Sequence, residues 1–296
     1  MTSTVYDVSQ FRKIEPKLLL FDAAARIPVT VREPRGVAAG ADGRIYVAGA
    51  DAVEVFDSNG KAASRFALSA AAGCIAVDAD GVASVGLRDR VDTFDPGGKR
   101  RGTWEALGAD AVLTSIAVAA ADVFVADAGN RRVHRFDRAG KRTGILGDTP
   151  VDGRPNGFLV PSPYFDVAVG PNAELWVVNP GEQRVENCTY DGRMKSMWGQ
   201  SSMAIDGFCG CCNPSHIAIR ADGAFVTSEK GLPRVKLYDP KGVFLGVVAG
   251  PEDFAEGTVG LDLAVDARGR VLVLDPTAGC VRVYVDKARK QEGAAP

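Results

Sequence analysis

The residues best suited to chemistry in this 296-residue chain lie in one short segment. Three of its six cysteines, Cys209, Cys211 and Cys212, fall within four residues, and His216 follows closely. Cys209 and Cys212 have C-x-x-C spacing with a glycine inside, which lets two thiolates converge on one ion. Sulfur ligands favour zinc, iron–sulfur clusters or Cu(I) over magnesium or calcium. The segment therefore predicts a metal or redox site.

Other roles for these cysteines stay open. A thioredoxin-like role needs a helix N-terminus in a βαβ unit, and the sequence does not indicate one. Cys211 and Cys212 are neighbours in the chain, so a disulfide between them would be strained and easily reduced. All three could also be reduced, buried cysteines that act as small hydrophobic side chains.

The composition is that of an ordinary globular chain, with 46% hydrophobic and 24% charged residues. The net charge of −2 gives no basic footprint, so nucleic acid is not an expected partner. The N-terminus lacks an apolar signal-peptide region and no apolar run approaches a membrane span, so we expect a cytoplasmic protein without a membrane partner. Thiols stay reduced in that compartment, which favours metal or redox roles for clustered cysteines.

Internal repeats dominate the rest of the sequence. Six segments share one template of short apolar runs separated by Asp-Gly-like turns, at an average spacing of about 45 residues, which is typical of propeller blades. They start near residues 36, 74, 115, 166, 216 and 262. A four-stranded unit cannot bury both faces alone, whereas a ring of six can. We therefore predict an all-β chain in which residues 1–296 form one six-bladed β-propeller.

The two ends of the chain must close this ring. The sixth repeat ends at its third strand, near Asp286, and a polar tail, 287–296, follows it. The segment 17–31 (KLLLFDAAARIPVTV) precedes the first repeat and is apolar enough to form a strand. We therefore expect this N-terminal segment to supply the missing outer strand of the last blade.

Several phrases resemble the NHL-repeat family of six-bladed β-propellers. They are Pro34-Arg-Gly-Val-Ala38, the run VADAGNRRVHRFDRAGK over 125–141, and the stretch from Gly207 to Ala218, which ends in Asn-Pro-Ser-His-Ile-Ala. The resemblance covers nearly the whole chain and implies a propeller fold. It leaves the function open, because such propellers include both enzymes and binding scaffolds.

Three blades depart from the template at the residue that opens the inner strand. Blades 4 to 6 have Asp166, His216 and Asp262 there, and all inner strands of a propeller start at one rim of the central channel. An imidazole between two carboxylates can perform acid–base catalysis, so these three residues are the candidate catalytic set. The alternative is a hydrated polar rim.

The cysteine segment is an insertion on the same rim, directly before His216. The third strand of most blades begins with Arg-Val, but in blade 6 Cys280 replaces the arginine, so we predict that it faces the segment. Cys209, Cys211, Cys212 and Cys280 are then the candidate metal ligands, a set that suits an iron–sulfur cluster. Cys209, Cys212 and His216 with an open position would suit zinc instead.

These patterns favour a metal- or iron–sulfur-binding propeller with a cysteine-rich loop beside the channel mouth, acting on or sensing a small polar ligand. The alternative is a non-catalytic NHL-type scaffold that binds a protein or a small molecule at the channel rim. A third hypothesis is a calcium-dependent lactonase with Asp166 and Asp262 as ligands, but the rim has few carboxylates for a hard cation.

Overall fold

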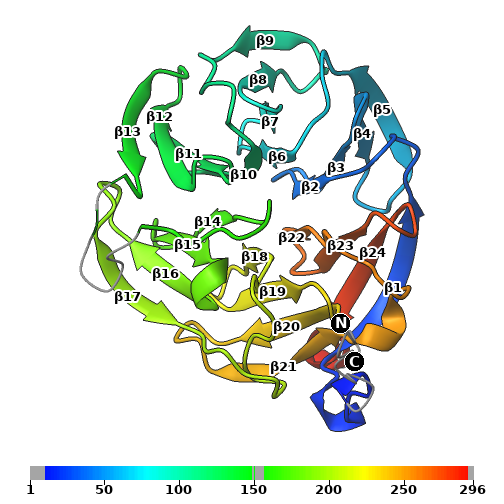
Figure 1. The fold of residues 1–296 in the computed structure, drawn as a ribbon. Helices are drawn as coiled ribbons and strands as arrows, with labels where there is room; N and C mark the ends of the chain where they lie inside the picture. The colour runs from blue at the N-terminus through cyan, green and yellow to red at the C-terminus, as the bar shows by residue number, and fades with distance from the viewer. Residues whose placement is uncertain (1–10, 149, 151–156, 293–296) are drawn as a thin grey trace, which may run out of the picture.

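The chain folds as six four-stranded antiparallel sheets arranged in a ring (Figure 1). The computed structural model describes residues 11–148, 150 and 157–292. In five sheets the strand that comes first in the chain lies nearest the centre of the ring, and in the sheet that joins the two chain ends the first strand of the chain lies outermost. The predicted all-β, six-bladed β-propeller is confirmed.

The first three blades follow one another along the chain. Their strands are β2 (Gly36–Ala39), β3 (Ile45–Ala48), β4 (Ala52–Phe56) and β5 (Ala62–Ala67); β6 (Cys74–Val77), β7 (Ala83–Gly86), β8 (Val91–Phe94) and β9 (Arg100–Thr103); and β10 (Leu113–Val118), β11 (Asp122–Asp127), β12 (Arg132–Asp137) and β13 (Arg142–Leu146).

The last three blades use the remaining strands together with the first strand of the chain. They are β14 (Val167–Val169), β15 (Leu175–Asn179), β16 (Arg184–Cys188) and β17 (Met194–Trp198); β18 (His216–Ile219), β19 (Phe225–Glu229), β20 (Arg234–Tyr238) and β21 (Phe244–Ala249); and β22 (Leu263–Val265), β23 (Val271–Asp275), β24 (Cys280–Asp286) and β1 (Phe21–Pro28).

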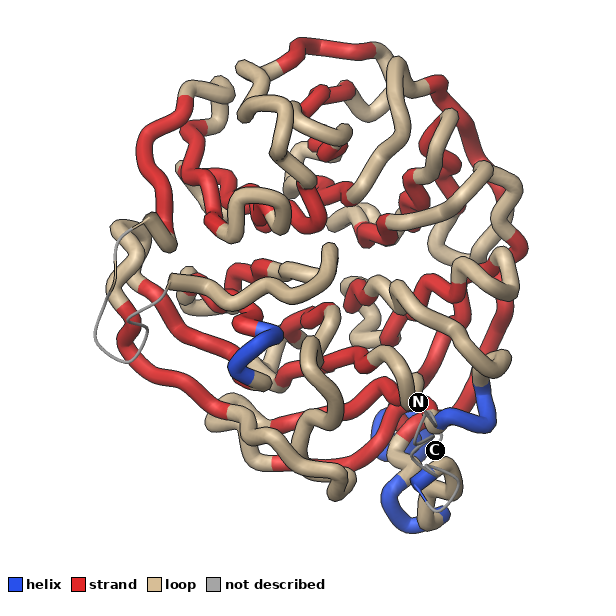
Figure 2. The backbone as a smooth tube through the Cα atoms, in the orientation of Figure 1, coloured by secondary structure: helices blue, strands red, loops and turns tan. Residues whose placement is uncertain are grey.

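Helical segments are short in the described part of the chain (Figure 2). They are η2 (Pro16–Leu18), η3 (Pro180–Glu182), η4 (Pro251–Asp253) and α1 (Lys287–Glu292). Among the described residues, no helix has the length and hydrophobicity needed to cross a bilayer.

The Asp-x-x-Gly turns of the repeats fix the outer hairpin of most blades. In the first blade, Asp57 Oδ1 accepts hydrogen bonds of 2.9 Å from the backbone N–H groups of both Asn59 and Lys61. Gly60 has φ +86°, a left-handed conformation that glycine adopts at no steric cost. The same pattern recurs in three other blades, at Asp95, Asp137 and Asp239.

The hydrophobic core lies between neighbouring blades. Each of the six buried apolar clusters combines side chains from two adjacent sheets; one, for example, joins Val85 and Phe94 of the second blade to Tyr46 and Val53 of the first. A blade therefore buries its faces only when both neighbours are in place, as expected for a stacked repeat.

β1 closes the ring by pairing antiparallel with β24, from Phe21 opposite Asp286 to Pro28 opposite Cys280. In Figure 1 the blue first strand lies alongside the red last strand. Phe21 joins the apolar cluster between blades 5 and 6, and Ile27 joins the cluster between blades 6 and 1. The predicted closure by the N-terminal segment is therefore confirmed, and the strand occupies the middle of the 17–31 segment.

Candidate functional site

His216 lies between two carboxylates at the mouth of the central channel. Its Nδ1 atom is 3.5 Å from Asp166 Oδ2 and 3.3 Å from Asp262 Oδ1. His216 opens β18, whereas Asp166 and Asp262 immediately precede β14 and β22. The repeat thus delivers equivalent positions of three successive blades to one point, as their sequence positions indicated.

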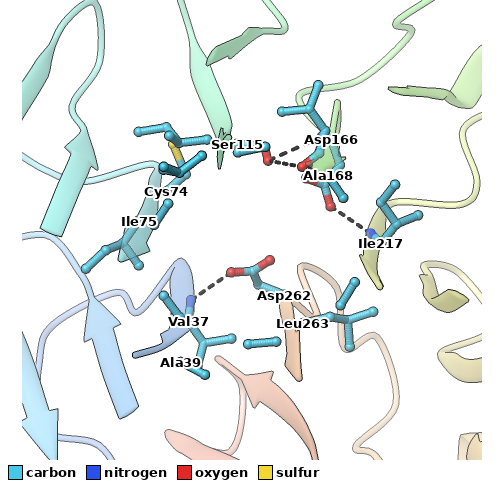
Figure 3. A pocket seen from close by; sticks show the side chains of 18 of the residues that line it. Val37, Ala39, Cys74, Ile75, Ser115, Asp166, Ala168, Ile217, Asp262 and Leu263 are labelled. Atoms are coloured by element: carbon cyan, nitrogen blue, oxygen red, sulfur yellow. Dashed lines mark hydrogen bonds between the residues drawn. The ribbon is translucent and has the colours of Figure 1, made fainter. Parts of the chain in front are cut away.

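Both carboxylates are held by main-chain donors of the next blade around the ring. Asp166 Oδ2 accepts a 2.7 Å hydrogen bond from the Ile217 N–H, and Asp262 Oδ2 accepts one of 2.7 Å from the Val37 N–H. Figure 3 shows both side chains at the channel with these two bonds. The two aspartates therefore also link blade 4 to blade 5 and blade 6 to blade 1.

The burial of this group changes the proton affinity of its members. Burial lowers the pKa of His216, but the polar interaction with Asp166 and the negative charges of Asp262 and Asp166 outweigh it and raise the pKa above 6.5. Burial raises the pKa of Asp262 to about 6; the positive charge of His216 opposes this shift and the negative charge of Asp166 adds to it. The group can therefore hold and release protons near neutral pH.

Two cavities adjoin this group, and Thr114 lines both of them. The central channel encloses about 270 Å³ between the inner strands, and Asp166 and Asp262 line it. Above the channel mouth, a wider cavity of about 620 Å³ has His216 in its wall. The other residues lining this wider cavity are mostly apolar or small, among them Ala71, Ala72, Val112, Leu113, Pro163 and Val259.

Tyr164 belongs to this site, although its own sequence position did not single it out. It lines the wider cavity, and its ring stands edge-on to His216 with centroids 5.9 Å apart. It comes from the extended segment GFLVPSPYFD before blade 4, whose length was the only signal in the sequence. The Lys230 Nζ atom lies 4.8 Å from the centre of the Tyr164 ring and donates a 2.9 Å hydrogen bond to Ser162.

The cysteine loop between β17 and β18 is fixed by a buried charged cluster. Arg234 Nε lies 2.5 Å from Glu229 Oε2, and Lys236 Nζ lies 3.4 Å from Glu229 Oε1. Lys236 donates a 2.6 Å hydrogen bond to the Gly207 carbonyl, and Arg234 donates to Cys209 Sγ at 3.8 Å. Cys209 is thus a buried anchor of the loop.

Cys211 and Cys212 face a different environment from Cys209. Their sulfur atoms are 3.3 Å apart; Cys211 is exposed and Cys212 is buried. Burial raises the pKa of the Cys212 thiol, but hydrogen bonds from Lys230, Ser162 and Cys211 outweigh it, so the pKa is lowered from 9.0. The hydrogen bond to Cys212 raises the pKa of Cys211.

Cys280 does not join the other cysteines, contrary to the prediction. Its thiol lies beside β1 of the same blade, where Arg26 Nη2 donates to Cys280 Sγ at 3.6 Å. The third strand is close to the outside of its blade, so a shared rim does not bring its first residue near the loop that enters the preceding blade. Within the described ranges, the one group of three or more candidate metal ligands is Asp166, His216 and Asp262, whose ligand atoms all lie within 4.8 Å of one another.

Comparisons with known proteins agree with this architecture. No family model matches the chain, and no curated protein sequence matches it. Among solved structures, a streptogramin B lyase superposes with a TM-score of 0.64 at 12% identity, covering 90% of this chain and 98% of that one. A virginiamycin B lyase from Staphylococcus aureus superposes with a TM-score of 0.57 at 15% identity, covering 86% of this chain and 82% of that one. At these identities the likeness is one of fold, and membership of the NHL-repeat family stays a prediction.

Proposed function

We propose that this propeller is an enzyme that performs acid–base chemistry on a small, largely apolar molecule bound above the channel mouth. The observation that carries the proposal is the position of His216, with Nδ1 between two carboxylates and the ring in the wall of a 620 Å³ cavity. A cavity of that size is typical of small-molecule sites. A non-catalytic scaffold does not require such a group.

The chemistry follows from the two edges of the imidazole. Asp166 and Asp262 stabilise a positive charge on His216 from the Nδ1 side, which leaves Nε2 as the nitrogen that can exchange a proton with a ligand in the cavity. A base that removes a proton beside a carbon–oxygen bond promotes its cleavage by elimination, which is a lyase reaction. The two structural neighbours named as lyases support this choice of reaction class.

The experiment compares the two histidines of the chain. His134 is also buried and also faces a carboxylate, with Nε2 3.3 Å from Asp127 Oδ2, but it lies on β12, away from the mouth. Wild type, His216→Asn and His134→Asn would be incubated with a streptogramin B and a panel of small cyclic esters. Elimination opens such a ring without a change of mass, whereas hydrolysis adds one water, so mass spectrometry distinguishes the two reactions.

We expect His216→Asn to reduce turnover by roughly 100-fold or more, as for the loss of a general base. His134→Asn should keep turnover in the protein that remains folded. Binding is measured in parallel, as ligand-induced shifts of the thermal midpoint. Equal turnover in wild type and His216→Asn, or the absence of any ligand-induced shift in wild type, would overturn the proposal.

A further inference from the structure

A thiol pair on the loop before His216 is independent of the proposed acid–base group. Cys211 Sγ and Cys212 Sγ are 3.3 Å apart, with Cys211 exposed and Cys212 4% exposed. We propose that these two residues form a dithiol site that exchanges with small disulfides and closes reversibly to a Cys211–Cys212 disulfide. The pair would thus reduce a low-molecular-weight disulfide to two thiols.

The surroundings of the pair are those of a reactive dithiol. The Lys230 ammonium and the Ser162 hydroxyl favour the thiolate form of Cys212 and outweigh its burial, so the pKa of this thiol is lowered. Ser162 and Lys230 are themselves joined by a 2.9 Å hydrogen bond, so two loops from adjacent blades define the position of the positive charge. The two sulfur atoms lie within hydrogen-bond distance of each other, so a proton can pass directly between them.

The loop keeps the two thiols in place from both sides. Asn213 Nδ2 donates to the Cys209 carbonyl at 2.6 Å and to the Lys230 carbonyl at 3.0 Å. The Lys230 N–H donates to Asn213 Oδ1 at 2.9 Å. Arg234 Nη2 donates to Cys209 Sγ at 3.8 Å, which fixes the start of the cysteine segment. The exposed thiol and its buried partner therefore stay adjacent without support from a helix.

The proposed exchange consists of two successive thiol–disulfide substitutions. The exposed Cys211 sulfur attacks one sulfur of a disulfide R–S–S–R, passes its proton to the Cys212 thiolate, and releases R–S⁻ from the cleaved S–S bond. Cys212 then gives its proton to that thiolate, and its sulfur attacks Cys211 Sγ, which releases the second R–S⁻; this group takes a proton from water. The two cysteines are oxidised by two electrons and R–S–S–R is reduced to two thiols.

The product would be reduced again easily. Neighbouring residues have Cα atoms about 3.8 Å apart, below the usual separation for a disulfide, so the closed form is strained. Strained disulfides have higher reduction potentials and belong to the labile, catalytic or regulatory class. A Cys211–Cys212 disulfide is therefore suited to cycling rather than to stabilising the fold.

The test uses the reduced full-length protein with a large excess of oxidised glutathione as the probe, so that mass action drives closure of the strained disulfide. Samples are quenched with acid, free thiols are alkylated, and the peptide containing 209–212 is analysed by mass spectrometry. In wild type we expect this peptide to lose two hydrogen atoms and to carry no glutathione. Cys212→Ser should stop at a glutathione adduct on Cys211, because the second attack is impossible. Cys211→Ser should react with oxidised glutathione at least roughly tenfold more slowly than wild type, because the remaining thiol, Cys212, is buried.

Two further variants separate this site from general thiol oxidation. Lys230→Gln should slow the wild-type reaction by several-fold, since the Cys212 thiolate loses its cation. Cys280→Ser should react like wild type, because Cys280 lies beside Arg26 in another blade. A stable glutathione adduct on wild-type Cys211, a disulfide that includes Cys209, or equal rates in Lys230→Gln and wild type would overturn the proposal. None of these readouts depends on turnover at His216.

Discussion

At the scale of single residues, burial beside Asp166 keeps a proton on Asp262 at a pH where an exposed aspartate has lost it. The pKa rises from 3.8 to about 6 in the folded protein. A group whose pKa is raised by folding stabilises the folded protein at pH values below its pKa in the unfolded chain. This contribution is lost as the pH rises through its pKa in the folded protein. The raised pKa of His216 acts in the same direction.

We therefore expect the free energy of unfolding to fall as pH rises from about 4 to 7. The raised pKa of Asp262 corresponds to about 3 kcal/mol of this change. That figure is an upper bound, because the side chain is 18% exposed and solvent weakens the effect. Asp262→Asn should flatten this profile, since it removes the titrating carboxyl and one of the two charges that raise the pKa of His216. Urea unfolding followed by tryptophan fluorescence at a series of pH values measures it. Asp80→Asn, at an exposed turn, is the control. Parallel profiles in wild type and Asp262→Asn would contradict the prediction.

At the scale of elements, the cysteine loop depends on a buried cluster with two cations and one anion. Glu229 is the shared partner of Arg234 and Lys236, and all three side chains are at most 1% exposed. Burial lowers the pKa of Lys236 to about 8, and the Glu229 charge opposes that shift. The Glu229 carboxylate therefore positions both cations that contact the cysteine loop.

Two substitutions in this cluster should differ in cost. Glu229→Gln leaves two buried cations without an anion and should destabilise the protein by about 3–5 kcal/mol. Lys236→Met keeps the Glu229–Arg234 pair and loses mainly the donor to the Gly207 carbonyl, so about 1–3 kcal/mol is expected. Urea titration at pH 7 gives both values. Equal losses, or a larger loss in Lys236→Met, would show that the carboxylate is not the shared support.

β1 is the element that closes the ring, and its removal can be tested directly. Deleting residues 1–28 leaves β24 as an unpaired edge and removes Phe21 and Ile27 from two interblade clusters. We expect the thermal midpoint to fall by roughly 10 °C or more. A synthetic peptide covering 19–30, added in trans, should restore part of the loss, whereas the same peptide with Ala25→Pro should not, because proline cannot donate to the ladder. An unchanged midpoint would reject the role of β1.

At the scale of the whole molecule, the separation of the cysteines argues against a four-cysteine metal centre. We expect anaerobically purified protein to be colourless and to contain no stoichiometric iron or acid-labile sulfide, because Cys280 lies apart from the loop and Cys209 is held by Arg234. Elemental analysis and a visible spectrum test this, with Cys209→Ser/Cys212→Ser as the comparison. Brown protein that loses its colour in this double variant would restore the iron–sulfur hypothesis.

The repetition of one template explains how far the sequence could predict this molecule. Six similar units specify a ring and the rim at which each residue lies, so the fold and the meeting of Asp166, His216 and Asp262 followed from position alone. Distances between loops of neighbouring blades do not repeat. The positions of Tyr164 and Lys230 depend on the conformations of two loops that do not repeat. Cys280 opens the third strand of its blade, as the template indicated, but its thiol contacts Arg26 of β1 instead of the cysteine loop.

The pairing of β1 with β24 also sets the order of events during synthesis. Some 250 residues separate Pro28 from its partner Cys280, so the first strand to leave the ribosome must wait for the last. At typical rates of translation this delay is roughly 10 to 50 seconds. During that time Phe21 and Ile27 have no completed interblade cluster to enter. The nascent chain thus exposes an unpaired strand with two apolar anchors, Phe21 and Ile27, until translation is nearly complete.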